Sequence, residues 1–384
     1  MRILLVNYME TTAPGGINKA VRELAKNLSK SIHEVTVLQS NPLDLPEEEM
    51  YEGFKIIRIS SKFEKHLYGL SYEMYKYLKK HFKELNPDIV HVHGYHTLFS
   101  PEIIYSIKKI SPETPVVFSP HFDIFSHDKF AGKYLWDPYN KIFGKKFSQY
   151  PAITFVASNF EGNNVNKLLE VPKEKIRVIA HGVDYNDVIA REYVDVIDRE
   201  KKKTRVNLLF VGYLLELKGV QYIIEAVAEL VKRYNVEVCL RIVGEGPYEK
   251  ELRKLAKNLK VDPFIKWEGF VQPSQNEKLM EYYTNSDIFL LLSESENYGI
   301  VVSEALSMGT PVIVTKRTAL TEFLDEPGCF GVDYPPKPEK VAKLIMDINE
   351  NDVNIGPFSA KIRNWNEVDT EYLKVYNEVL GVNK

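Results

Sequence analysis

The 384-residue sequence has little cysteine, almost no net charge and no long apolar run. Its two cysteines, Cys239 and Cys329, are too few for a disulfide framework and lack the spacing of metal ligands. A net charge of −3 argues against general nucleic-acid binding, so no nucleic-acid partner is expected. No apolar stretch approaches the ~20 residues that cross a bilayer, and residues 1–10 do not resemble a signal peptide. We therefore expect a soluble, cytoplasmic protein.

The length of the chain indicates more than one hydrophobic core. A chain of 384 residues, 44% of them hydrophobic, exceeds what a single core usually covers, which predicts two domains. Residues 185–204 carry two acid-rich clusters followed by a run of basic residues, a composition typical of a linker. We place the first domain at residues 1–185, the linker at 186–204 and the second domain at 205–365.

The most informative stretch runs from residue 287 to residue 315. Its apolar run Ile288–Leu292 has the length of a buried strand and is too short for a helix. A polar loop and Gly299 follow, and then a helical pattern begins at Ile300 and ends at Gly309. A second apolar run, Val312–Val314, predicts another strand. Strand, helix and strand form a βαβ unit, which places ligands at the carboxyl ends of its strands.

Two glutamates lie at that position. Glu296 is in the loop, and Glu304, eight residues later, lies just inside the helix. The first turn of a helix has free N–H groups and the positive end of the helix dipole, which suit a phosphate. Carboxylates beside it are better suited to accept hydrogen bonds from hydroxyls, so the pattern favours a ligand with both phosphate and sugar. Two isolated glutamates are more often a loop acid and a solvated helix face, which is the alternative for Glu296 and Glu304.

Two further strand–loop–helix patterns contain glycines. The first joins the strand Ile3–Val6 to a helix at 17–28 through Gly15 and Gly16. The second joins a strand at 207–211 to a helix at 219–232. Adjacent glycines let a backbone lie close to a bulky ligand, although a tight turn is the alternative explanation.

Histidines accompany two predicted strands of the first domain. His91, His93 and His96 belong to or follow the strand at 88–93, and His121 follows the strand at 116–119. Such a group raises the hypothesis of a metal site. Because no carboxylate or cysteine lies at ligand spacing, we predict no metal.

Three segments carry a resemblance to a known family. They are SESENYGIVVSEALSMGTPV (293–312), PGGINKAVRELAKNLSKSIHEVTVLQ (14–39) and NLLFVGYLLELKGVQYIIEAV (207–227). The sequence resembles the retaining glycosyltransferases of family 4 (glycosyl transferases group 1), from Met1 to about Leu380. The resemblance implies the α/β fold known as GT-B, in which two Rossmann-like domains face each other across a cleft. It also implies that the C-terminal helix, residues 366–384, crosses back to the first domain.

The resemblance also implies a donor, a nucleotide-diphosphate sugar, and the residues that hold it. Glu296 would face hydroxyls of the donor sugar, Glu304 would hold the ribose, and Lys218 would clamp the diphosphate together with the amides after Glu296. His121, in the motif SPHFD, would contact a sugar hydroxyl. The implied catalytic residues are His121, Lys218 and Glu296, and the implied donor-binding residues are Gly15, Gly16, Tyr213, Gly244, Phe270, Val271, Asn297, Tyr298, Gly299, Ile300 and Glu304.

The sequence departs from the family pattern at three points. Tyr213 stands where the family usually has an arginine, so one cationic contact to the diphosphate is missing. Thr318 and Ala319 stand where the family often has two glycines, and His181 replaces the asparagine of an Asn-Gly-Val-Asp turn. The first two departures motivate the hypothesis of a nucleotide-sugar-binding protein with weakened catalysis.

The implied function is retaining transfer of a hexose from a nucleotide-diphosphate sugar to a sugar, glycan or lipid-linked acceptor, with no cofactor and no metal. Alternatives are a glycoside hydrolase that uses Glu296 and Glu304 as acid and nucleophile, and a GT-B sugar-nucleotide epimerase. The helix at 70–85 carries four lysines. They form either a solvated face or a surface that contacts an anionic membrane peripherally. The donor base (UDP, GDP or ADP), the hexose, the acceptor and the oligomeric state stay open.

Overall fold

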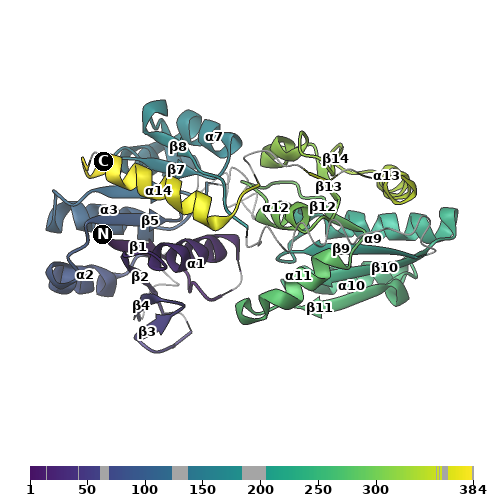
Figure 1. The fold of residues 1–384 in the computed structure, drawn as a ribbon, viewed down its shortest axis with the longest axis horizontal. Coiled ribbons are helices and arrows are strands. Elements are labelled where there is room, and N and C mark those ends of the chain that lie inside the picture. The colour runs from purple at the N-terminus through teal and green to yellow at the C-terminus, as the bar shows by residue number, and fades with distance from the viewer. Residues whose placement is uncertain are drawn as a thin grey trace. The chain divides into compact units, whose positions relative to one another are not determined.

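The computed structural model describes residues 1–13, 15–41, 43–60, 69–122, 137–183, 205–351, 353, 355–356 and 362–382. The chain forms two compact units, one of Met1–Gly182 with Trp365–Lys384 and the other of Val183–Asn364. The predicted linker, residues 186–204, lies outside the described residues. Each unit is an α/β structure built on one mainly parallel sheet (Figure 1).

The first unit contains an eight-stranded sheet with strand order β3-β4-β2-β1-β5-β6-β7-β8. The strands are β1 (Arg2–Asn7), β2 (Glu34–Ser40), β3 (Glu48–Tyr51), β4 (Phe54–Ile59), β5 (Ile89–His93), β6 (Val116–Ser119), β7 (Thr154–Val156) and β8 (Ile176–Val178). Only β3 runs antiparallel to its neighbour, β4. The central strands are nearly continuous apolar runs because helices cover both faces of the sheet.

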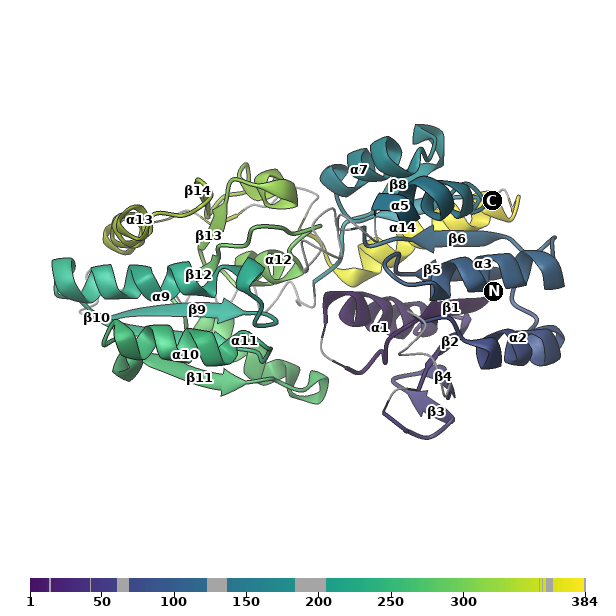
Figure 2. The same ribbon diagram turned by 180° about the vertical axis from the view of Figure 1, so that it is seen from behind.

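Helices complete a hydrophobic cluster on each face of this sheet. They are α1 (Gly16–Ser29), α2 (Tyr72–Leu85), α3 (Phe99–Ile110), α5 (Asp137–Tyr139), the π-helix η3 (Asn140–Gly144), α6 (Lys145–Phe147), α7 (Asn159–Leu169) and α14 (Trp365–Val379). Ile3 and Leu5 of β1 point to the cluster of α1 and α14. Leu4 and Val6 belong to the opposite cluster, which residues of α2 and α3 complete. Figure 2 shows these two helices beside the first sheet.

The C-terminal helix packs on the first unit, which confirms the sequence-based prediction. Trp365, Tyr372 and Tyr376 of α14 are buried in the same cluster as residues of α1. The Tyr376 hydroxyl lies 2.7 Å from Nδ1 of His91 in β5. This hydrogen bond links the end of the chain to the middle of the first sheet.

The second unit contains a six-stranded parallel sheet with strand order β11-β10-β9-β12-β13-β14. Its strands are β9 (Arg205–Val211), β10 (Glu237–Val243), β11 (Ile265–Gly269), β12 (Ile288–Leu291), β13 (Val312–Thr315) and β14 (Cys329–Val332). The chain builds outward from β9 to β11 and then returns to add β12 on the other side of β9. In open parallel sheets, ligands bind at the carboxyl end of such a reversal point.

The helices of the second unit are α9 (Val220–Glu229), α10 (Glu249–Asn258), α11 (Asn276–Thr284), α12 (Ile300–Ser307) and α13 (Pro338–Glu350). Two short 3-10 helices, η5 (Glu216–Lys218) and η9 (Thr318–Phe323), follow β9 and β13. The helix expected at 219–232 ends as α-helix at Glu229 and continues as the π-helix η6, Leu230–Tyr234. No prediction from the sequence covered α3, α13, β3 or β14. The buried residues Ile103, Ile104 and Ile107 of α3 have helical spacing that could have revealed it.

Both cysteines are free thiols. Cys239 is buried in β10, and Cys329 is half-buried at the start of β14. Burial raises the pKa of the Cys329 thiol, which keeps it protonated and unreactive at neutral pH. Within the described ranges, no helix is long and apolar enough to cross a membrane.

Candidate active site

The carboxyl ends of β9 and β12 bring together two predicted site residues that lie 78 positions apart in the sequence. Lys218 ends η5, and its Nζ lies 2.7 Å from Oε1 of Glu296 in the β12–α12 loop. The Ser293 hydroxyl donates to the same carboxylate oxygen at 2.8 Å. Both charged side chains keep some solvent exposure, 22% for Lys218 and 13% for Glu296. The pair therefore places a positive and a negative group side by side, both in contact with solvent.

Backbone packing places these two loops against each other. Gly219 has a φ of +74°, and a Cβ built there would lie 2.0 Å from the carbonyl oxygen of Leu292. No side chain fits at this position, so glycine is required for Lys218 to approach the β12 loop. The amide of Glu294 donates to the carbonyl of Leu217 at 2.7 Å and closes the contact.

Glu304 lies in the second turn of α12, the helix that follows the β12–α12 loop, and is buried with 4% exposure. The hydroxyl of Tyr283 in α11 donates to its Oε2 at 2.8 Å. Burial and the nearby carboxylate raise the pKa of Tyr283 well above its usual value, so this hydroxyl stays a donor. The alternative in which Glu304 belongs to a solvated helix face is therefore wrong.

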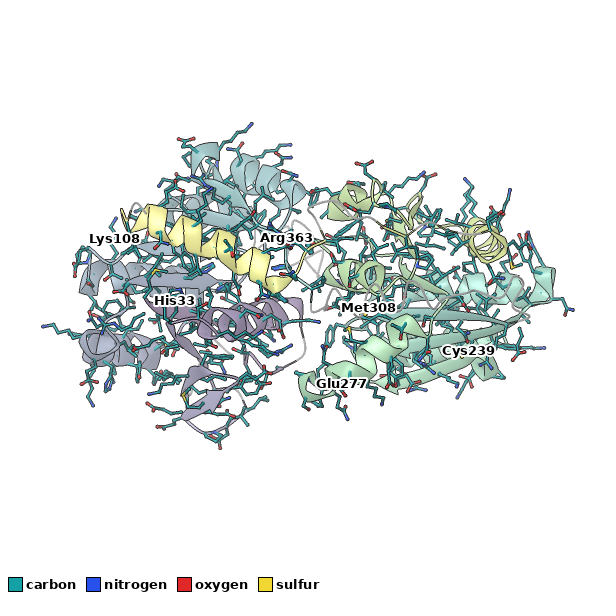
Figure 3. All side chains as sticks on the ribbon, in the orientation of Figure 1. His33, Lys108, Cys239, Glu277, Met308 and Arg363 are labelled. Atoms are coloured by element: carbon teal, nitrogen blue, oxygen red, sulfur yellow. The ribbon has the colours of Figure 1, made fainter. Side chains whose placement is uncertain are left out.

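Helix α12 begins directly after Gly299, which caps it with a φ of +94°, and ends at Ser307. Met308, the residue that follows, is labelled in Figure 3. Ile300 is thus the first helical residue, and the N–H groups of the first turn have no carbonyl partner within the helix. The buried side of the helix contains Val302 and Ala305, whereas Val301 is half-exposed.

The two residues before Gly299 have different surroundings. The Tyr298 ring is buried, packs against Phe323 with ring centroids 5.2 Å apart, and accepts a hydrogen bond from the Ser303 hydroxyl at 3.0 Å. Burial raises the pKa of Tyr298 to about 12, so this phenol stays neutral. Asn297 is half-buried. Of Tyr298, only the backbone is placed to contribute to a site in this loop.

The loops after β9, β10 and β11 are joined by backbone hydrogen bonds. Gly244 donates to Gly269 at 2.8 Å, and Gly212 donates to Val243 at 3.0 Å. A Cβ at Gly244 would lie 1.9 Å from the carbonyl oxygen of Gly212, so the loops meet backbone to backbone. Tyr213 is 48% exposed beside them, and residues 270–271 are half-buried after β11. Tyr213 brings a phenol but no positive charge to this edge.

In the first unit, Gly15 and Gly16 lie at the start of α1, and a buried polar network fixes the loop before them. Gly15 is the N-cap of α1 and Gly16 is its first residue. Nε of Arg58 donates to Oε2 of Glu10 in that loop at 2.8 Å, and both side chains are 1% exposed. Arg22 of α1 also donates to the carbonyl of Thr11 at 3.1 Å. The loop that precedes the two glycines is therefore held by charged contacts from β4 and α1.

His121 lies in a row of imidazoles, between His93 and His181. Its Nε2 is 3.3 Å from Nδ1 of His93, and its ring stacks on His181 with centroids 6.0 Å apart. Burial, reinforced by His93 and His181, lowers the pKa of His121 well below the usual value. The imidazole is therefore neutral at neutral pH and can both donate and accept a hydrogen bond.

The other histidines of the row have structural contacts. His91 uses both ring nitrogens, one with Tyr376 and the other with the Ser119 hydroxyl at 2.8 Å. The rings of His91 and His93 lie with their centroids 4.1 Å apart and are tilted by 30° to each other. In the part of the chain that the structure describes, no group of three His, Cys, Asp or Glu side chains is placed to hold a metal ion.

Three residues that contact the two glutamates were not among the site residues predicted from the sequence. Ser293 binds the Glu296 carboxylate, Tyr283 binds the Glu304 carboxylate, and the Thr318 hydroxyl accepts a hydrogen bond from the Glu296 amide at 3.1 Å. Ser293 is the first residue of the segment 293–312 that carries the family resemblance, and Thr318 stands at a departure from the family pattern. Nothing local in the sequence singles out Tyr283, because its contact crosses from one helix to another.

Two family models match the chain over nearly its whole length. The model Glycosyltransferase Family 4 matches residues 14–187, and the model Glycosyl transferases group 1 matches residues 195–365. The chain belongs to the family 4 glycosyltransferases. Members of this family are retaining hexosyltransferases that take nucleotide sugars as donors. The chain is therefore a transferase, and the glycoside hydrolase and epimerase alternatives are wrong.

Individual relatives of this glycosyltransferase support the assignment. The Uncharacterized glycosyltransferase MJ1607 of Methanocaldococcus jannaschii is 27% identical over 343 residues, which cover 85% of this chain and 83% of that protein. The Alpha-monoglucosyldiacylglycerol synthase of Acholeplasma laidlawii is 23% identical over 373 residues, or 94% and 91% of the two chains. The structure of sucrose-phosphate synthase from Thermosynechococcus elongatus matches with a TM-score of 0.77 at 16% identity, covering 99% of both chains. The fold of this glycosyltransferase is therefore GT-B, as predicted.

Proposed function

We propose that this glycosyltransferase transfers a hexose, with retention, from a nucleotide-diphosphate sugar to a sugar, glycan or lipid-linked acceptor. The observation that carries the proposal is the contact of Lys218 with Glu296, 2.7 Å long, at the carboxyl ends of β9 and β12. Residues 205–365 would supply the donor site, and residues 1–185 with 366–384 would supply the acceptor side. The relative from Acholeplasma laidlawii is, by its name, a synthase of alpha-monoglucosyldiacylglycerol, which supports a lipid acceptor as one candidate.

The charges at this site fit departure of a diphosphate. When the bond between the anomeric carbon and the diphosphate oxygen breaks, its electron pair stays on the diphosphate, and positive charge develops on the sugar. The ammonium group of Lys218 and the N–H groups at the start of α12 would stabilise that negative charge. Tyr298, Gly299 and Ile300 would contribute their backbones, because the Tyr298 ring is buried elsewhere.

The acceptor hydroxyl would then bond to the anomeric carbon on the face that the diphosphate leaves. Its proton would pass to the departing diphosphate oxygen, so atoms and charge balance without a separate protein base. Glu296 would hold hydroxyls of the donor sugar by hydrogen bonds, and Glu304, oriented by Tyr283, would accept hydrogen bonds from the ribose. Tyr213, Gly244, Phe270, Val271 and Asn297 would complete the donor site of the second unit, in which Tyr213 brings a phenol in place of a cation. In the first unit, Gly15, Gly16 and the neutral imidazole of His121 would each offer hydrogen bonds to the nucleotide sugar.

The proposal is tested first on the donor. Thermal unfolding is measured with UDP-, GDP- and ADP-sugars, and the stabilising compound is then assayed for release of its nucleotide in the presence of acceptors. Lys218→Ala should lower turnover by about 100-fold, because loss of one group that stabilises the leaving charge costs ~3 kcal/mol in the barrier. The matched control is Lys232→Ala, an exposed lysine of the same unit in η6. Turnover by Lys218→Ala equal to that of the control would reject the role of Lys218.

The exposed face of α2 favours a lipid-linked acceptor at an anionic membrane. Tyr72, Lys76, Lys79, Lys80 and Lys83 are exposed on this helix, whereas its buried side packs into the first unit. The Lys76 ammonium lies 4.4 Å from the centre of the Tyr72 ring. Basic residues mixed with an aromatic ring suit the interface of an anionic bilayer.

Sedimentation with lipid vesicles tests this contact. Charge reversal of Lys79, Lys80 and Lys83 to glutamate should abolish binding to vesicles that contain anionic lipid, and the wild type should not bind neutral vesicles. The matched control reverses the exposed Lys254, Lys257 and Lys260 of the second unit. Equal loss of binding in both triple variants would show a general charge effect and contradict a specific role of α2.

A further inference from the structure

Thr318 has a backbone conformation that its side chain disfavours. Its φ is +53°, in the left-handed region. Glycine occupies this region readily, but for a β-branched residue such a φ is a genuine outlier, because the branched Cβ crowds the backbone. Such a conformation persists only where surrounding contacts hold it, and it concentrates at functional sites.

The contacts that hold Thr318 reach Glu296. The Thr318 Oγ1 accepts a hydrogen bond from the Glu296 amide at 3.1 Å and donates to the carbonyl of Arg317 at 2.8 Å. The amide of Ala319 donates to the Glu296 carbonyl at 3.3 Å. Both backbone polar groups of Glu296 are therefore bound by the first two residues of η9.

The side chain of Glu296 has two further contacts. Lys218 and Ser293 both bind its Oε1. The loop also has a second link to β13, since the Thr315 hydroxyl donates to the carbonyl of Ser293 at 2.6 Å. Removal of the Thr318 hydroxyl would thus free the Glu296 amide without unfolding the loop.

We propose that Thr318 is a positioning residue for Glu296. Its hydroxyl fixes the backbone from which the carboxylate projects, and the left-handed backbone brings that hydroxyl into reach. A glycine would relax the backbone but could not bind the Glu296 amide. The proposal rests on the proposed function only as far as Glu296 contacts the donor. A shift of about 1 Å in a positioning group is enough to lower turnover by about 100-fold.

Three substitutions separate the hydroxyl from the strain. Thr318→Ser keeps the hydroxyl, Thr318→Gly removes hydroxyl and strain, and Thr318→Val removes the hydroxyl but keeps the branched Cβ. Nucleotide release from the sugar donor should stay within about 2-fold of wild type in the serine variant and fall by about 10- to 100-fold in the glycine and valine variants. The thermal midpoint of the glycine variant should exceed that of the valine variant by about 2–6 °C.

This pattern excludes a merely structural role, in which activity would follow stability and the glycine variant would outperform the valine variant. Wild-type turnover by the glycine or valine variant would overturn the proposal. Hydrogen exchange of the peptide that contains residues 293–299 is read in parallel without any substrate. Exchange at the Glu296 amide should be faster in the glycine and valine variants than in the serine variant, and equal exchange would also overturn the proposal. If wild type releases nucleotide from no donor, the proposed function fails, and the exchange comparison still decides the role of Thr318.

Discussion

Asp369 should make the first unit less stable as the pH rises from about 4 to 7. This carboxylate lies on α14, is 7% exposed, and its Oδ1 has no hydrogen-bond partner among the described residues. Burial raises its pKa from 3.8 to about 7, an effect that the charge of Lys30 offsets only in part. Asp369→Asn removes the charge while keeping the shape of the side chain.

The sign follows from proton binding. Between pH 3.8 and about pH 7 the folded protein holds the Asp369 proton that the unfolded chain releases, so the free energy of unfolding falls as the pH rises through this window. Each unit of pKa difference corresponds to about 1.4 kcal/mol, so the loss reaches at most about 4 kcal/mol above pH 7. The asparagine side chain of the variant does not titrate. The advantage of Asp369→Asn should therefore grow from about pH 4 to pH 7 and stay constant above.

Urea unfolding of wild type and Asp369→Asn at about pH 4 and pH 8 measures this difference. Glu367→Gln, an exposed acid on the same helix, is the matched control and should show no comparable change with pH. A difference between Asp369→Asn and wild type that is the same at both pH values would refute the reasoning, because the carboxylate would then have the same pKa in the folded and unfolded chain.

Three further predictions concern the site. Lys218→Ala should lower turnover, measured as nucleotide release, by about 100-fold, because the negative charge on the departing diphosphate loses a stabilising cation. Lys232→Ala should not lower it. Tyr283→Phe should raise KM for the donor by about 10-fold with little change in kcat, because it removes the hydrogen bond by which the Tyr283 hydroxyl orients the Glu304 carboxylate. An unchanged KM would contradict this. Because burial keeps the pKa of His121 well below 6.5, a pH profile of kcat/KM should show no inflection near pH 6.5, and an inflection that His121→Asn abolishes would contradict it.

Local pattern was enough to place most elements of both sheets. The apolar runs at 288–292 and 312–314 became β12 and β13, and the strand predicted at 116–119 has those bounds in the structure. A buried strand must be apolar along its length, so its residues reveal it without knowledge of its neighbours. The motif with Glu296 and Glu304 also indicated the family and GT-B fold, which the comparisons confirm.

Contacts between distant residues were decided only by the tertiary structure. The pairing of Lys218 with Glu296 depends on β12 returning beside β9, and the burial of Glu304 depends on a hydroxyl from α11. In the same way, the sequence shows only that Thr318 stands where the family often has a glycine. The structure shows that the Thr318 hydroxyl binds the Glu296 amide. A strand or a capped helix is encoded by neighbouring residues, but a hydrogen bond across 22 or 78 positions depends on how the sheet brings its strand ends together.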